Sequence, residues 1–300
     1  MKNRMPGSKM DRSTDNSGGA GQARLPRGAI MSDPRNLAWC YQQELAWKRG
    51  NLHIEDWYLQ TLIRNGPRAR EICGRHFVAL CREFAAAHGR IPSMLDVGCG
   101  PITSFAYLAH EGLAEIFGVD PLARRYAALL AEFGLESPAE QRDGAGEWLE
   151  RVWPGREFDI VVTRNALDHH QCPALAWLRM FEHTRVGGYL GQSHSIREAT
   201  KEGWKQLHQY DLYPDENHVH LWLDDGRGKD ICLTSRLPME KVFSTARYND
   251  DGTGWFVSVY QKKDTAVPSD YFEAVLEHAA HALEKRHLWA LGLESFIAGS

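Results

Sequence analysis

The sequence predicts an α/β fold: a doubly wound, mostly parallel sheet of seven strands with an N-terminal helical lid and an inserted β-hairpin. Five expected strands alternate with helix-like segments between residues 93 and 193. Two further strand-like runs, at 241–247 and 255–261, then follow with no helix between them. Alternating strands and helices are typical of a parallel sheet covered by helices on both faces. A chain of 300 residues with 43% hydrophobic content can form one such domain with appendages.

The pattern of apolar residues predicts each element in turn. The run Phe158–Thr163 is continuous and rich in β-branched residues, as a strand buried on both faces requires. Two short runs, His218–Leu223 and Asp230–Ser235, flank a turn at 224–228 and predict the inserted hairpin, which we expect to cover a binding pocket. A last helix is expected over Tyr271–Leu291. The remaining expected elements are strands near 93–97, 116–119, 139–142 and 188–193, and helices at 103–112, 122–133, 146–152 and 173–184.

Shifts in composition divide the chain into four parts. Residues 1–35 are polar and rich in glycine, so we expect a disordered tail, in which Met31 is an alternative start. Residues 36–88 place aromatic side chains at helical spacing and predict a helical cap over a cleft. Residues 89–265 form the expected sheet domain, with the insert at about 194–236, and residues 266–300 form the expected C-terminal helix.

Charge and cysteine content exclude some classes of protein. The formal net charge of −4 disfavours a general nucleic-acid binder, which needs a clustered basic surface to neutralise phosphates. The six cysteines contain no Cys-x-x-Cys pair, so we expect reduced thiols and a cytoplasmic protein. No apolar run reaches the length that spans a bilayer, and we therefore expect no membrane partner.

A glycine-rich loop follows the first predicted strand. Asp96, Gly98 and Gly100 form an Asp-x-Gly-x-Gly sequence where a helix-like stretch begins. Glycines let the backbone turn sharply and approach a ligand, and a helix N-terminus offers unpaired amide donors. A nucleoside cofactor is therefore expected here. The dinucleotide fingerprint requires a third glycine, and Thr103 occupies its position, which disfavours that class.

Polar residues also end the next three predicted strands. Asp120 ends the second strand and can accept hydrogen bonds from both hydroxyls of a ribose. The pair Asp143 and Ala145 follows the third strand, and the sequence Asn165–His170 follows the fourth. A Gly187-Gly188 turn then precedes the fifth strand.

These five landmarks, in this order, resemble the motifs of class I S-adenosylmethionine-dependent methyltransferases over roughly residues 90–195. The resemblance implies a Rossmann-like fold, S-adenosyl-L-methionine as cofactor and residues 89–265 as the catalytic domain. It implies that Asp143 contacts the adenine amino group and that the loop at Asn165 lies beside the sulfonium. The cofactor-binding residues expected are Asp96, Gly98, Gly100, Asp120, Asp143, Ala145 and Asn165.

Methyl transfer requires alignment of an acceptor and removal of its proton. The loop after the fourth strand offers Asn165, Asp168 and His169, and the segment expected after the fifth offers His194 and His208. A histidine titrates near neutral pH and can act as a general base. Further candidates in that segment are Arg197, Glu198, Trp204 and Gln209. We expect no metal site, because the close pairs His169-His170 and His218-x-His220 are not completed by a known ligand spacing.

The loop Asn165-Ala166-Leu167-Asp168-His169 departs from the Pro-Pro-aromatic sequence of many amine methyltransferases. Together with Leu207-His208-Gln209 it resembles a bacterial subgroup associated with small molecules or saccharides. We therefore expect methyl transfer to a small-molecule acceptor, in small-molecule biosynthesis. The loop is also similar to that of synthases of the same fold that cyclise the cofactor itself to azetidine-2-carboxylate and methylthioadenosine. A cofactor-binding regulator without catalysis is a third hypothesis. The acceptor atom and the oligomeric state stay open.

Overall fold

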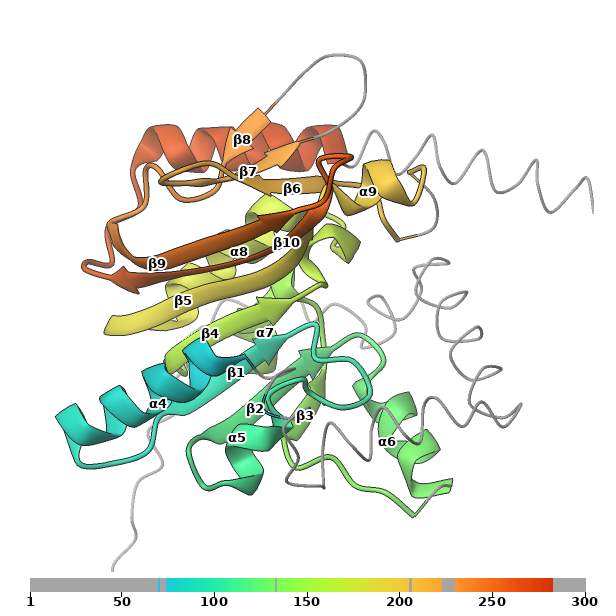
Figure 1. Cartoon of the computed structure of the whole chain (residues 1–300), viewed down its shortest axis with the longest axis vertical. Coiled ribbons are helices and arrows are strands. Elements are labelled where there is room, and N and C mark those ends of the chain that lie inside the picture. The colour runs from blue at the N-terminus through green and yellow to red at the C-terminus, as the bar shows by residue number, and fades with distance from the viewer. Residues whose placement is uncertain (1–69, 71–73, 133, 205–206, 223–229, 283–300) are drawn as a thin grey trace, which may run out of the picture.

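The fold was obtained as a computed structural model, which describes residues 70, 74–132, 134–204, 207–222 and 230–282. A seven-stranded sheet forms its centre, and its first five strands are parallel (Figure 1). The last two strands are antiparallel to their neighbours. The predicted α/β fold is therefore confirmed. The strands lie in the order β3 (Glu140–Asp143), β2 (Glu115–Asp120), β1 (Ser93–Val97), β4 (Phe158–Arg164), β5 (Thr184–Ile196), β10 (Gly254–Lys262) and β9 (Met239–Tyr248).

Helices cover both faces of this sheet. Alternate residues of a strand point to opposite faces, and in β1 Leu95 belongs to one hydrophobic cluster and Met94 to another. The cluster of Leu95 includes side chains of α7 (Leu149–Val152), α8 (Pro173–His183) and the helix at 269–282. The cluster of Met94 contains α4 (Arg75–His88) and α5 (Ala106–His110). The remaining helical segments are η1 (Gly146–Trp148), α6 (Ala123–Glu132), η2 (Leu167–His169) and α9 (Glu198–Lys201).

Strand β5 extends beyond its predicted limits of 188–193. It runs from Thr184 to Ile196 because β10 pairs with it as far as Ile196. The sequence prediction ended where polar residues begin, but cross-strand hydrogen bonds continue through them. His194, which we expected after the fifth strand, therefore lies inside it, opposite Phe256.

The predicted hairpin of the insert is a sheet of three antiparallel strands. Strands β7 (Val219–Trp222) and β8 (Asp230–Cys232) correspond to the two expected strands, and the turn at 224–228 lies outside the described residues. The sequence analysis missed β6 (Asp211–Pro214), which pairs with β7. Four residues that begin with Asp and end with Pro carry too weak a strand signal, and pairing with β7 decides their conformation.

The outer segments are described only in part. The described residues 74–88 of the expected N-terminal cap contain α4. Its Phe77 packs edge-on against Phe105, the residue that precedes α5. The C-terminal helix is confirmed as far as residue 282. The expected tail at 1–35 and the aromatic segment before residue 70 lie outside the described residues.

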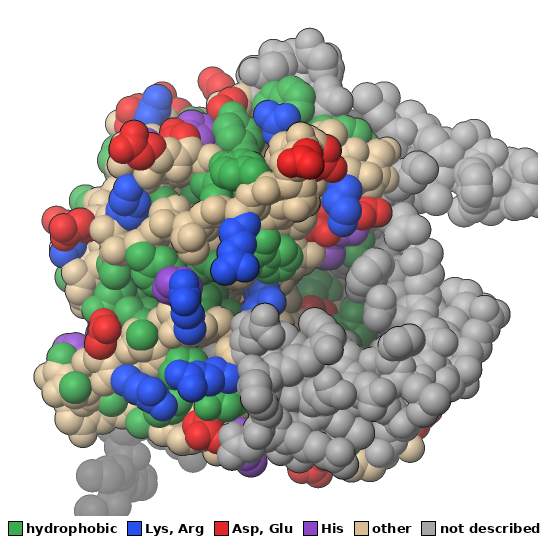
Figure 2. Space-filling model, viewed as in Figure 1, with side chains coloured by type: hydrophobic (Ala, Val, Ile, Leu, Met, Phe, Trp, Pro, Cys, Tyr) green, Lys and Arg blue, Asp and Glu red, His purple; other side chains and the backbone are tan. Residues whose placement is uncertain are grey.

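Charged side chains of both signs lie on the surface (Figure 2). On the face seen in Figure 2, Lys and Arg side chains are interspersed with Asp and Glu, so this face does not carry charge of a single sign. Within the described ranges, each helix is too short or too polar to cross a bilayer.

A buried carboxylate ties β4 to β1 and β5 at the edge of the sheet where β1 and β4 begin. Asp159 is 1% exposed and accepts two hydrogen bonds from the Arg90 guanidinium, at 2.6 and 2.7 Å. It also accepts bonds from the amide and hydroxyl of Ser93 and from Arg185. Burial acts to raise the pKa of Asp159, but these donors outweigh it and lower the pKa to about 2.

We predict that Asp159 makes stability depend on pH in the acid range. The folded pKa of about 2 lies below the ordinary value of 3.8, so its contribution is complete above pH 4 and is lost between pH 4 and 2. Asp159→Asn should lower the free energy of unfolding at pH 7 by about 2 kcal/mol, a difference that shrinks toward pH 2. Urea unfolding at several pH values measures this. Glu182→Gln, in the exposed pair with Arg179, is the control and should change little at any pH.

Candidate active site

The polar residues predicted from the sequence meet at the carboxyl edge of the parallel strands. In the register of the sheet, Val97 of β1 lies beside Val119 and Thr163, and Asp120 of β2 lies beside Asp143 of β3. The loops after β1, β2, β3 and β4 therefore leave the sheet side by side. Open α/β sheets bind their ligands at this edge.

Two glycines shape the loop after β1. Gly98 has φ of +75°, and a Cβ atom there would overlap the Cβ of Ala166 in the loop after β4. Gly100 has φ of +64°, and a Cβ there would meet no atom within 4 Å. Gly98 thus lets two loops touch, whereas Gly100 faces open space. This space is where a ligand can approach the backbone.

Asp96 lies beneath this loop and is 1% exposed. Its Oδ2 accepts a hydrogen bond of 2.6 Å from the Thr103 hydroxyl, and its Oδ1 has no hydrogen-bond partner among the described residues. Burial raises the pKa of Asp96 to about 7. A buried polar atom without a partner is costly, so a ligand that donates to Oδ1 would be favoured here.

Asp120 is the second acid of this edge. It accepts hydrogen bonds from the amides of Gly100, at 3.0 Å, and Leu122, at 2.9 Å. Burial raises its pKa to about 6 against the effect of these amides. A carboxylate has about four acceptor positions. The two amides leave about two of these positions for other donors.

Asp143 is the last residue of β3, beside Asp120, and Ala145 lies two residues beyond it. The Asp143 carboxylate accepts a 2.7 Å hydrogen bond from the Arg124 amide and pairs with the Arg124 side chain at 3.1 Å. Ala145 is half-buried and directly precedes η1. Both residues lie at the edge where the sequence analysis expected them, and their contact with a nucleobase stays a prediction.

The loop after β4 is joined to β5 by Asn165. This residue has φ of +47°, its amide donates to the Ser193 carbonyl, and its Oδ1 accepts from the Ser195 amide at 3.0 Å. Asn165 also hydrogen-bonds the Glu198 carboxylate, whose other oxygen, Oε2, is buried without a hydrogen-bond partner among the described residues. Asn165 therefore fixes the loop after β4 against β5 and against Glu198 of α9. Its side chain makes hydrogen bonds within the protein.

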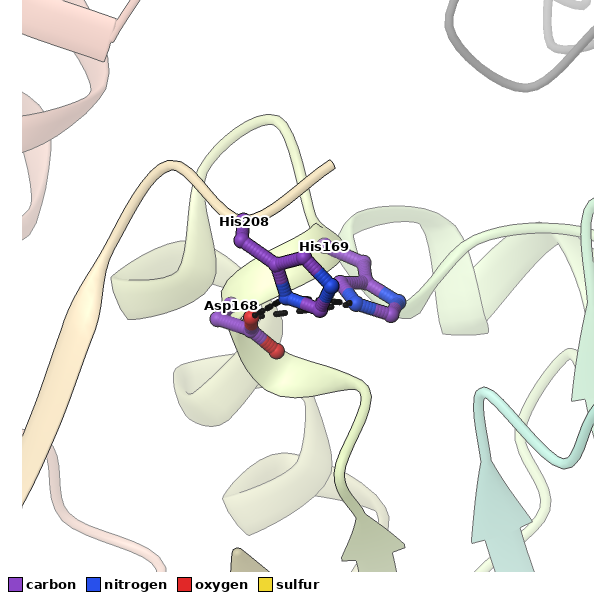
Figure 3. Close-up of side chains that lie close together, drawn as sticks. All are labelled: Asp168, His169 and His208. Carbon is purple, nitrogen blue, oxygen red and sulfur yellow. Dashed lines mark hydrogen bonds and ion pairs between the residues drawn. The ribbon is translucent and has the colours of Figure 1, made fainter. Parts of the chain in front are cut away.

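Asp168 lies at the centre of a cluster of histidines. It belongs to η2 and is completely buried. His194 Nε2 lies 2.9 Å from its Oδ1, and His208 Nδ1 lies 2.8 Å from its Oδ2. His169 Nε2 faces the same Oδ2 at 3.7 Å and His208 Nδ1 at 3.3 Å (Figure 3). Burial acts to raise the pKa of Asp168, but His169 and His194 outweigh it, so the pKa lies well below its ordinary value.

The three histidines differ in charge and exposure. Both ring nitrogens of His194 face oxygen acceptors, Asp168 and the Ser195 carbonyl, so this fully buried ring carries two protons. Burial acts to lower its pKa, and Asp168 raises it above the ordinary value. Burial lowers the pKa of His169 to about 4, so this ring is neutral at pH 7. The side chains of His169 and His208 are 21% and 16% exposed, and they form the accessible side of the cluster.

The other candidates of this region lie at its margin. Arg197 is exposed at the start of α9, where its φ is +53°. Trp204 contacts the Trp222 ring edge-on, and its carbonyl accepts a hydrogen bond from Gln209. These residues hold the segment that carries His208.

Two further residues, which we did not select from the sequence, support the loops of the site. Thr103, noted only because it replaces a glycine, holds Asp96. His170 is buried against Gly146, with its Nδ1 at 2.9 Å from the Ala166 carbonyl. Its place in a His-His pair was visible in the sequence, but its neighbours depend on how the loops after β3 and β4 meet.

The comparisons with known proteins find similarity to methyltransferases. Residues 95–191 match the family model of a methyltransferase domain. An uncharacterised methyltransferase of Schizosaccharomyces pombe is 34% identical over an alignment of 106 residues, and the match covers 32% of this chain. This match spans 37% of that relative, little more than a third of its length.

Solved methyltransferase structures are similar at low sequence identity. The N-methyltransferase NodS of Bradyrhizobium japonicum, in complex with S-adenosyl-L-homocysteine, gives a TM-score of 0.44 at 13% identity, over 74% of this chain and 98% of that one. The 1,6-didemethyltoxoflavin N1-methyltransferase of Burkholderia thailandensis gives 0.42 at 16% identity, over 78% of this chain and 92% of that one. The family model matches residues 95–191.

We predict that Gly98 and Gly100 differ in their tolerance of alanine. Gly98→Ala should cost about 2 kcal/mol or more in free energy of unfolding, because it adds a clash with Ala166 to an unfavourable φ. Gly100→Ala should lower the free energy of unfolding by about 1 kcal/mol, because it places alanine at a positive φ without adding a clash. Urea unfolding of both variants measures the difference. Equal losses would contradict the contact between the two loops.

Proposed function

We propose that this chain, whose residues 95–191 are a methyltransferase domain of the class I S-adenosylmethionine-dependent superfamily, transfers a methyl group to a small-molecule acceptor. One observation carries the proposal. The Gly98 loop and Asp120, which suit a nucleoside cofactor, share an edge of the sheet with the histidine cluster of Asp168. Gly98 and Ala166 bring the two loops into contact. A cofactor and an acceptor can therefore be held side by side.

The cofactor is S-adenosyl-L-methionine, which supplies a methyl group on a positively charged sulfur. Asp120 would accept hydrogen bonds from the ribose hydroxyls through the acceptor positions that Gly100 and Leu122 leave free. Asp143 and Ala145 would lie along the adenine. Asp96 would receive the amino group of the methionine part at its unpartnered Oδ1.

The acceptor would contact His169 and His208, the two partly exposed members of the cluster. Methyl transfer depends on alignment, so the protein has to place an acceptor atom in line with the sulfur and favour loss of the acceptor's proton. Asp168 and His194 are fully buried and act by positioning. Asp168 holds the His208 ring through Nδ1, and Asn165 holds the loop on β5. The acceptor that suits this cluster is a small molecule with an O–H or N–H group.

We predict that Asp120→Ala weakens the binding of S-adenosylhomocysteine by about 10- to 100-fold, because hydrogen bonds to a charged group contribute about 1.5–3 kcal/mol. Isothermal titration calorimetry on the full chain measures this. Asp215→Ala, an exposed acid of the insert, is the control and should bind like the parent chain. No binding by the parent chain, or equal binding by Asp120→Ala, would overturn the cofactor site.

Incubation with S-adenosylmethionine alone tests the reaction. We predict that the cofactor stays intact when no acceptor is present, and that a library of small hydroxylated and amino compounds then yields a product 14 mass units heavier by mass spectrometry. Asp168→Ala should reduce its formation by about 100-fold or more, the range that positioned proton transfer contributes. Methylthioadenosine with a cyclic amino acid, formed without any acceptor, would instead identify cyclisation of the cofactor. Cofactor binding without any product would point to a regulator.

A further inference from the structure

We infer that Asp168, His169 and His208 form a binding site for a divalent transition-metal ion. The three residues come from two segments, η2 and the loop before β6, and they meet at one point (Figure 3). From the sequence we expected no metal site, because the histidine pairs are not completed by a known spacing of metal ligands along the chain. The role given to the ion below rests on the proposed function, whereas the site itself does not.

The spacing of the donor atoms suits a single small cation. Asp168 Oδ2, His169 Nε2 and His208 Nδ1 form a triangle with sides of 2.8, 3.3 and 3.7 Å. Ligands at about 2.0–2.2 Å from a tetrahedral or octahedral ion lie roughly 3.0–3.5 Å from one another. A position about 2.1 Å from all three atoms therefore exists just outside the plane of the triangle.

The donors also select the kind of ion. Two imidazole nitrogens and one carboxylate oxygen suit zinc, iron(II), cobalt or nickel. Calcium and magnesium favour sites made wholly of oxygen, so they fit less well. Three protein ligands leave further coordination positions open. The partial exposure of His169 and His208 places those positions on the accessible side of the cluster.

A second shell supports the three ligands. His194 donates to Oδ1 of Asp168, which leaves Oδ2 facing the two other histidines. Such carboxylate–histidine contacts orient ligands in metal sites. Glu198, 8% exposed, has an oxygen without a hydrogen-bond partner among the described residues, and a carboxylate oxygen of Glu198 lies within 4.8 Å of donor atoms of Asp168 and His194.

Binding of the ion requires the lone pair of His208 Nδ1. The proton that Nδ1 shares with Asp168 moves to Nε2 of the same ring or to solvent, and the ion takes its place. No electron is gained or lost. In the proposed reaction the ion would bind the acceptor's oxygen or nitrogen and make its proton easier to lose, as a bound cation does for water.

The test uses the full chain after treatment with a chelator. Cobalt(II) is titrated and followed by its visible absorption, and zinc(II) is titrated by calorimetry. We expect one ion per chain, with binding weakened more than about 100-fold in His169→Gln and in His208→Gln. The control His220→Gln removes a histidine that also lies between two carboxylates, Asp215 and Asp230, and should bind like the parent chain.

Paramagnetically shifted ring protons in the cobalt-loaded parent chain give a second measurement that needs no variant, and signals from two histidines are expected. Absence of stoichiometric binding, or binding that both variants retain, would overturn the metal site. Titration of the same samples with S-adenosylhomocysteine separates the two proposals. Binding of the nucleoside without metal overturns only the metal site, and binding of metal without the nucleoside overturns only the proposed function.

Discussion

A completely buried carboxylate, Asp168, is the interaction on which the site depends. Burial of a charge in a protein interior is costly unless it is paired and hydrogen-bonded. The partners of Asp168 come from three places: His169 beside it in η2, His194 inside β5, and His208 in the loop before β6. The charge of one residue therefore requires that β4, β5 and the insert meet at one point.

The rest of the fold meets that requirement. Strand β5 must continue to Ile196 to carry His194 past the end of β4, and pairing with β10 supports this extension. Asn165 binds the loop after β4 to the backbone of β5. At the opposite edge, Asp159 anchors β4 to its neighbours through Arg90 and Ser93. The strand that presents Asp168 is thus held at both ends, and the close contact of Gly98 with Ala166 sets its distance from the cofactor loop.

Much of this arrangement could be predicted from the sequence, for physical reasons. A continuous apolar run such as Phe158–Thr163 predicts a buried strand, and polar residues at strand ends predict a ligand edge, because parallel strands end together. The strands that carry Asp96 and Asp120 follow from these rules. The strand that carries Asp143 has no apolar run, and the resemblance to class I methyltransferases is what predicts it.

Contacts between distant segments could not be predicted in this way. Local propensity does not place β6, since its four residues depend on pairing with β7. A prediction from local propensity ends β5 too early, because hydrogen bonds to β10 continue the strand through Ser193 and His194. The approach of His208 to Asp168, 40 residues away, depends on the path of the insert, and no periodic pattern records it.

We infer that a cofactor bound at Asp120 presents its sulfur to the cluster of Asp168. A crystal structure of the full chain with S-adenosylhomocysteine would reveal where the sulfur lies. We expect the ribose hydroxyls on Asp120 and the sulfur turned toward His169 and His208, close enough for an acceptor to lie between them. A nucleoside bound elsewhere, or a sulfur directed away from both histidines, would contradict this arrangement of cofactor and cluster.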